Sequence, residues 1–266
     1  MLVTGVAGVA MFCAGPRESG QRIVLTGSST LAPLMVELGR AFEVQHPQIR
    51  VDVQTGGSSR GITDARRGVA DLGMVSRSLK SEESDLQPFL VARDGICFIV
   101  HGDNPVRQIS TEQVRAIYTG EVRNWQDVGG PASPLVVVHK AAGRSTQELF
   151  LQYFQLSPGD VRADVIIGDN EQGIKTVAGN RAAIGYVSIG TAAYHISHGA
   201  PIRALPLDGI PATVEAVSAG RYPLVRELNL VCRGQPSEPV AQFLRFVQSS
   251  ASGPIIEEQY FVPATD

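Results

Sequence analysis

Apolar positions along the chain alternate between short unbroken runs and stripes that recur every three to four residues. The runs, such as Arg22–Thr26 and Ile49–Thr55, have the length and β-branched character of strands. The stripes are typical of amphipathic helices, and the first helix is predicted over Leu31–His46, ahead of Pro47. The chain therefore begins with a strand, a helix and a second strand, which is how an α/β fold begins.

The same alternation continues to the end of the chain. Further strands are predicted at 72–75, 94–100, 135–138, 165–167, 184–187 and 228–232. Helices are predicted over 62–72, from the capping box of Ser110 and Gln113 to Tyr118, and at 147–155, 172–178 and 238–247. This order predicts an α/β protein with mostly parallel sheets, and a break at 101–105 suggests two domains.

Composition and charge narrow the function classes. The chain has 266 residues, enough for one large domain or two small ones with a sizeable core. A net charge of −3 excludes a general attraction to nucleic acid or to an anionic membrane, so a bound anion must be held by a local site. No apolar run reaches the ~20 residues of a membrane span.

The first 15 residues are small and apolar, which is typical of the core of an export signal. A buried first strand or short helix is the alternative. Cys13 could carry a lipid anchor, although Phe12 before it is a poor match to a lipidation site. Cys97 and Cys232 lie in apolar runs as buried thiols, and whether they pair stays open.

One type of loop occurs three times between a strand and a helix: Gly27–Thr30, Gly56–Gly61 and Gly143–Thr146. Each places backbone N–H groups, hydroxyl donors and a helix N-terminus at one spot, as an oxyanion site requires. Ordinary helix capping is the better explanation of any single loop, and it is the repetition in three loops that makes a shared oxyanion site an equal alternative. No loop matches a nucleotide-binding motif, so the expected ligand is a small, compact anion.

A second hypothesis is a serine hydrolase. Gly57–Gly61 fits the Gly-x-Ser-x-Gly nucleophile elbow, with Ser59 as nucleophile and His195 and His198 downstream. Only two clear strands precede this loop, and no His-Gly-Gly oxyanion segment accompanies it, so we disfavour catalysis. The histidines are too isolated to indicate a metal site, and no cofactor is expected.

Several motifs together resemble the phosphate-binding, substrate-capturing proteins of bacterial phosphate-specific ABC transporters, of the compact type. Each motif is weak alone, but their number and order span nearly the whole chain after residue 20. The matching segments are Thr26–Leu34, Gln54–Gly61, Ala70–Arg77, Ile117–Trp125, Val136–Lys140, Gly143–Thr146, Ala183–Val187 and Ser218–Pro223.

The resemblance implies a type II periplasmic-binding-protein fold, with two α/β lobes joined by a two-strand hinge. Lobe I would comprise residues 21–101 and 215–266, and lobe II residues 102–214, with 1–20 as signal remnant or linker. It also implies a monomer that binds phosphate outside the cytoplasm, in the periplasm or attached to the surface. Such a protein delivers phosphate to a membrane permease and is not an enzyme.

The resemblance also implies ligand residues. Carried over by position they are Ser29, Thr30, Ser58, Ser76 and Arg77 from one lobe, and Lys140, Arg144, Ser145 and Thr146 from the other. Two departures matter. Lys140 stands where many relatives have Arg, and Ser76-Arg77 stands near the Asp that accepts a proton from phosphate in longer relatives. Another tetrahedral oxyanion such as sulfate therefore stays an alternative ligand.

Overall fold

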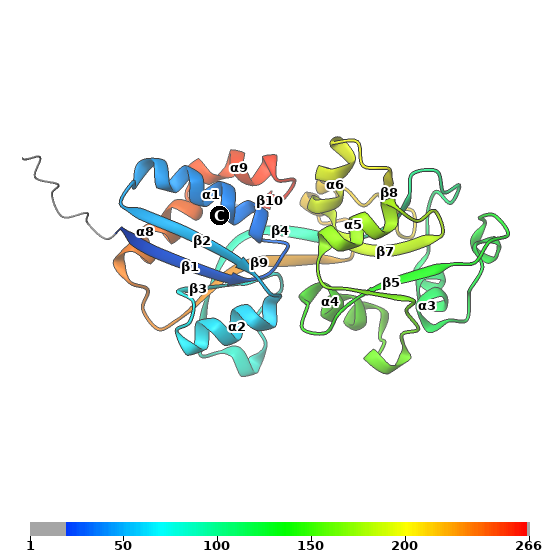
Figure 1. Ribbon diagram of the computed structural model, residues 1–266, viewed down its shortest axis with the longest axis horizontal. Helices are drawn as coiled ribbons and strands as arrows, with labels where there is room; N and C mark the ends of the chain where they lie inside the picture. The colour runs from blue at the N-terminus through cyan, green and yellow to red at the C-terminus, as the bar shows by residue number, and fades with distance from the viewer. Residues whose placement is uncertain (1–19, 265–266) are drawn as a thin grey trace, which may run out of the picture.

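The computed structural model describes residues 20–264, and the export signal and lipid anchor expected at the N-terminus lie outside this range. Two lobes lie side by side, and strands β4 (Leu86–His101) and β9 (Val225–Arg233) run between them (Figure 1). Within residues 20–264, no helix has both the length and the apolar character needed to cross a membrane.

The first lobe is built on a parallel three-stranded unit in the order β2-β1-β3, extended by β9 and β4. Short β10 (Val262–Pro263) pairs with β4. The remaining elements are β1 (Gln21–Gly27), α1 (Ala32–Gln45), β2 (Ile49–Thr55), α2 (Ser58–Arg67), β3 (Leu72–Val75), α8 (Glu238–Val247) and α9 (Gly253–Glu258).

The second lobe continues the sheet in the order β4-β7-β5-β6, with β8 also on β4. Its strands are β5 (Val136–Lys140), β6 (Val165–Ile167), β7 (Ala183–Ser188) and β8 (Ile202–Leu205). Its helices are α3 (Thr111–Thr119), α4 (Ser145–Phe154), α5 (Asn170–Ala178), α6 (Ile189–Ser197) and α7 (Val214–Ser218).

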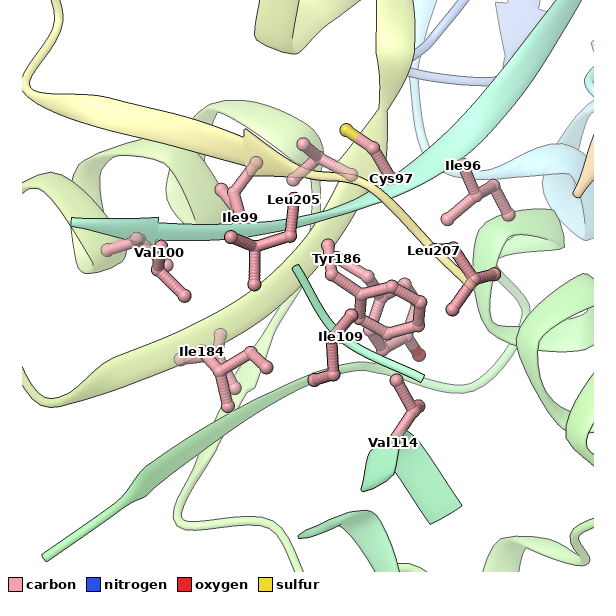
Figure 2. Packing of buried hydrophobic residues seen from close by; sticks show 14 of the residues in the cluster. Ile96, Cys97, Ile99, Val100, Ile109, Val114, Ile184, Tyr186, Leu205 and Leu207 are labelled. Carbon is pink, nitrogen blue, oxygen red and sulfur yellow. The ribbon is translucent and has the colours of Figure 1, made fainter. Parts of the chain in front are cut away.

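Each lobe has its own hydrophobic core. The first contains Ile23, Leu38 and Phe42 with the apolar face of α8. The second surrounds Phe98 and Tyr186, and Figure 2 shows β4, β7 and β8 side chains packing there. Buried Cys97 and Cys232 belong to different cores and are free thiols.

The structure confirms the predicted two-lobed α/β fold, with two differences. The sheets are mixed rather than mostly parallel, and every antiparallel pair among the described strands involves β4 or β9, the two strands that run between the lobes. Ile96–Val100 and Ala216–Leu224, assigned from sequence to lobe I, pack in the second core. The cores therefore change over nearer to Asp94 and Arg226 than to residues 101 and 215.

Candidate functional site

The three glycine-hydroxyl loops meet where the lobes face each other. Parallel strands present their carboxyl ends at the same edge of a sheet, so the loops after β1 and β2 lie together with the segment after β3. The third loop follows β5 and faces them from the other lobe. Six small hydroxyl residues of these segments are almost completely buried: Ser28, Thr30, Ser58, Ser76, Ser145 and Thr146.

The serine hydroxyls form a chain that crosses between the lobes. Ser58 Oγ donates to Ser145 Oγ at 3.0 Å, and Ser145 Oγ donates to Ser76 Oγ at 3.2 Å. Ser58 Oγ also accepts from the Ser76 backbone N–H at 3.1 Å, and Ser28 Oγ contacts Ser76 Oγ. The lobes are thus closed on each other through polar groups, each of which can donate or accept.

A buried ion pair, missed by the sequence analysis, lies beside this chain. Asp94 on β4 and Arg226 on β9 are direct cross-strand partners, and both side chains are only 1% exposed. Arg226 Nη2 lies 2.8 Å and Nε 3.1 Å from Asp94 Oδ2. The same guanidinium donates to Thr146 Oγ1 at 2.8 Å and to Thr30 Oγ1 at 3.1 Å. One residue of the hinge therefore contacts hydroxyls of both lobes.

Lys140, at the end of β5, is buried and points into the same region. Its Nζ donates to Asn170 Oδ1 at 2.9 Å. Asn170, the first residue of α5, donates in turn to Thr30 Oγ1 in the other lobe at 3.1 Å and to Thr191 Oγ1 at 3.2 Å. Burial, and next the nearby Arg226, lower the pKa of Lys140 to about 7.

Arg77 does not join the cluster, although it follows Ser76 directly. Its Nη1 and Nη2 donate to both carboxylate oxygens of Glu83, at 2.6 and 2.8 Å. Its Nε lies 3.0 Å from Glu148 Oε2 of α4, which also lies 3.1 Å from Lys80 Nζ. Ser76 and Arg77 follow the last residue of β3, and their side chains diverge, with Ser76 pointing into the cluster and Arg77 towards these acids.

Two other predicted ligands, Ser29 and Arg144, are half-buried at the rim, and neither side chain makes a hydrogen bond within residues 20–264.

Gly57 lies close to the opposite lobe. Its φ is +92°, and a Cβ there would lie 2.8 Å from the carbonyl oxygen of Gly143. Only glycine allows the two loops to approach so closely.

The geometry gives no support to a hydrolase. Ser59 is exposed, and its backbone N–H donates to the Gly143 carbonyl at 3.4 Å. His195 Nε2 pairs with Glu171 Oε1 at 2.8 Å, and His198 Nδ1 contacts the Tyr194 carbonyl. Within the described part of the chain, neither histidine hydrogen-bonds Ser59, so a nucleophile and its base are not brought together.

The comparisons with known proteins agree with this geometry. The phosphate-binding protein PstS of Bacillus subtilis (strain 168) is 25% identical over 260 residues, covering 95% of this chain and 84% of that protein. A phosphate ABC transporter substrate-binding protein from Clostridium perfringens, solved with bound phosphate, is 29% identical with a TM-score of 0.87 and covers 92% of this chain and 100% of its own. An ABC-type phosphate transport receptor from Vibrio cholerae is 28% identical with a TM-score of 0.70, covering 91% of this chain and 99% of its own.

A family model provides the assignment itself. The model for the PBP superfamily domain matches residues 14–251, which include all of the loops, both hinge strands and the whole buried cluster. The relatives align over nearly the full chain and share its two-lobed architecture. The chain therefore belongs to the PBP superfamily.

Proposed function

We propose that this protein binds inorganic phosphate between its two lobes and delivers it to the permease of an ABC transporter. It acts as a monomer on the outer side of the cytoplasmic membrane, and it performs no chemistry on its ligand. The observation that carries the proposal is the buried cluster of hydroxyls and cations, which draws donors from both lobes and from the hinge. The names of the aligned relatives support phosphate as the ligand.

The proposed ligands differ in part from those expected from sequence. We keep the buried residues Thr30, Ser58, Ser76, Lys140, Ser145 and Thr146, and we add Arg226 as the principal cation. Ser29 and Arg144 are half-buried and stay in the proposed set because they lie in the loops that carry the buried ligands. A tetrahedral anion suits this set, because charge-assisted hydrogen bonds from several directions hold its oxygens. The lobes must open to admit it and close to trap it.

The hydroxyls also allow the site to accept a phosphate that carries a proton. Monohydrogen phosphate must donate its proton to an acceptor, whereas sulfate has no proton to donate. Ser58, Ser76 and Ser145 can each turn a lone pair towards the ligand, because a hydroxyl accepts as well as donates. We propose that they replace the acceptor carboxylate of longer relatives.

Calorimetric titration of protein that has been unfolded, stripped of ligand and refolded tests this function. Phosphate is expected to saturate one site per chain, and sulfate is titrated under the same conditions as the competing tetrahedral anion. Tighter binding of sulfate than of phosphate would support the alternative ligand. Absence of binding by either anion would refute the oxyanion proposal.

Arg77 has a different proposed role, which is to hold the closed lobes together. It belongs to lobe I, and Glu148 on α4 belongs to lobe II, so their contact exists only when the lobes are closed. Glu148→Gln is expected to weaken phosphate binding by about two- to tenfold, mainly through faster dissociation, because the pair is partly exposed. Stopped-flow measurement of release checks this.

Glu112→Gln is the matched control, because Glu112 is an exposed acid on helix α3 of the same lobe. It is expected to leave the dissociation rate unchanged. If Glu148→Gln behaves like this control while Arg77→Ala abolishes binding, Arg77 is an anion ligand after all and the proposed role is wrong.

A further inference from the structure

The two buried cations of the site differ in how their charges are balanced. Arg226 has its own counter-ion in Asp94 at 2.8 Å. Lys140 is bound instead by the neutral amide oxygen of Asn170 at 2.9 Å. Asn170 is itself fixed by donating to Thr30 and Thr191, so its oxygen is the end of the amide that faces the lysine. An Asp at this position would neutralise Lys140, whereas Asn orients it without cancelling its charge.

The other charged groups around Lys140 leave this imbalance in place. Arg226 on β9 and Arg144 before α4 disfavour a charged lysine, while Asp169 and Glu171, on either side of Asn170, favour it. Glu171 is exposed and paired with His195. Neither carboxylate therefore replaces a direct counter-ion within the described residues.

The polar groups of the second core behind Lys140 are also neutral. Burial lowers the pKa of His139, the preceding residue on β5, to about 4. Burial raises the pKa of Tyr186 above its ordinary value, and its hydroxyl contacts His139 Nδ1 at 2.9 Å. At neutral pH both side chains are uncharged, so the interior offers Lys140 no compensating charge.

We propose that Lys140, oriented by Asn170, takes up a proton when the anion binds, so that capture of phosphate is linked to pH. This inference rests on the proposed function. In the closed arrangement of the lobes, desolvation favours the neutral amine, and a dianion placed beside it favours the ammonium form by direct Coulomb attraction. Asn170 is accordingly a positioning residue, which sets the geometry and the charge state of the group that touches the ligand.

Raising the pH is expected to weaken phosphate binding. In the closed lobes, where burial lowers the pKa of Lys140 to about 7, the amine is mostly neutral at about pH 8.5. An anion that raises this pKa by several units would then draw about one proton into the complex. The association constant is expected to fall by roughly tenfold per pH unit between about pH 8 and 9, where phosphate in solution is mainly the dianion.

Calorimetry at about pH 8.5 in two buffers of different ionisation enthalpy measures the proton uptake directly. Wild-type protein is expected to take up about one proton per phosphate. Lys140→Arg is expected to take up almost none, because Arg stays protonated even when buried, and its affinity should become nearly independent of pH. Melting temperatures of all variants establish that they are folded.

Asn170→Asp is the sharper test of the positioning role. Its carboxylate would hold Lys140 protonated before binding, so uptake should fall well below half a proton, and affinity should fall by at least about tenfold. Asn170→Ala removes the orientation without adding charge, and it is expected to retain uptake while binding more weakly.

Three outcomes would overturn the inference. Uptake that persists in Lys140→Arg would place the proton on phosphate or on another side chain. Phosphate binding by the wild type without proton uptake would contradict this inference alone. Absence of phosphate binding by the wild type would overturn the proposed function as well.

Discussion

Arg226→Met is expected to weaken phosphate binding by roughly 100- to 10,000-fold. The substitution removes the cation that reaches Thr30 and Thr146 and leaves the buried Asp94 carboxylate without its partner. Removing one partner of a buried, hydrogen-bonded charge pair at a binding site costs about 2–5 kcal/mol of affinity, and here the Asp94 charge that is left has the same sign as the ligand. Titration calorimetry, or competition against a labelled anion at the weak end, measures this loss.

Two further variants make the result specific. Arg233→Met removes an exposed arginine at the end of the same strand and should change affinity by less than about threefold. Arg226→Met combined with Asp94→Asn removes both charges and should bind more tightly than Arg226→Met alone. If Arg226→Met binds phosphate as the wild type does, Arg226 is only a structural hinge residue.

Asp94→Asn is expected to cost the ligand-free protein about 3–5 kcal/mol of unfolding free energy. Arg226 would keep its charge at a position where its side chain is 1% exposed, and Asn neutralises none of that charge. For a chain of this size, such a loss lowers the Tm by roughly 6–20 °C.

Phosphate supplies the control for this second prediction. A bound anion replaces part of the missing negative charge beside Arg226, so saturating phosphate should raise the Tm of Asp94→Asn by more than it raises that of the wild type. An equal increase in both proteins, or an unchanged Tm without ligand, would contradict the proposed energetics of the pair.

Local sequence patterns were sufficient to predict most of the fold. The capping box of Ser110 and Gln113 and the apolar stripe of α1 depend only on neighbouring residues, and both occur in the structure as expected. The three loops could be located because glycines and hydroxyls at a strand–helix junction have a local cause. Strand β8 and helix α6 were missed because their short, mixed segments lack a clear period.

The buried ion pair could not be predicted from local sequence patterns. Asp94 and Arg226 are 132 positions apart, and only the antiparallel register of β4 and β9 makes them partners. Charged residues inside otherwise apolar strands were the available signal, since a charge is almost never buried without a partner. Arg77 was placed at the correct strand end, but the position of a residue along a strand does not reveal which carboxylates its side chain meets.

An anomalous difference map from crystals grown with arsenate, a heavier analogue of phosphate, would test the central claim most directly. We expect one arsenic peak between the lobes, with its oxygens about 3 Å from Arg226 and from the hydroxyls of Ser145 and Thr146. A peak only on the surface, for example beside Arg66, Arg67 and Arg233, with none between the lobes, would contradict the account.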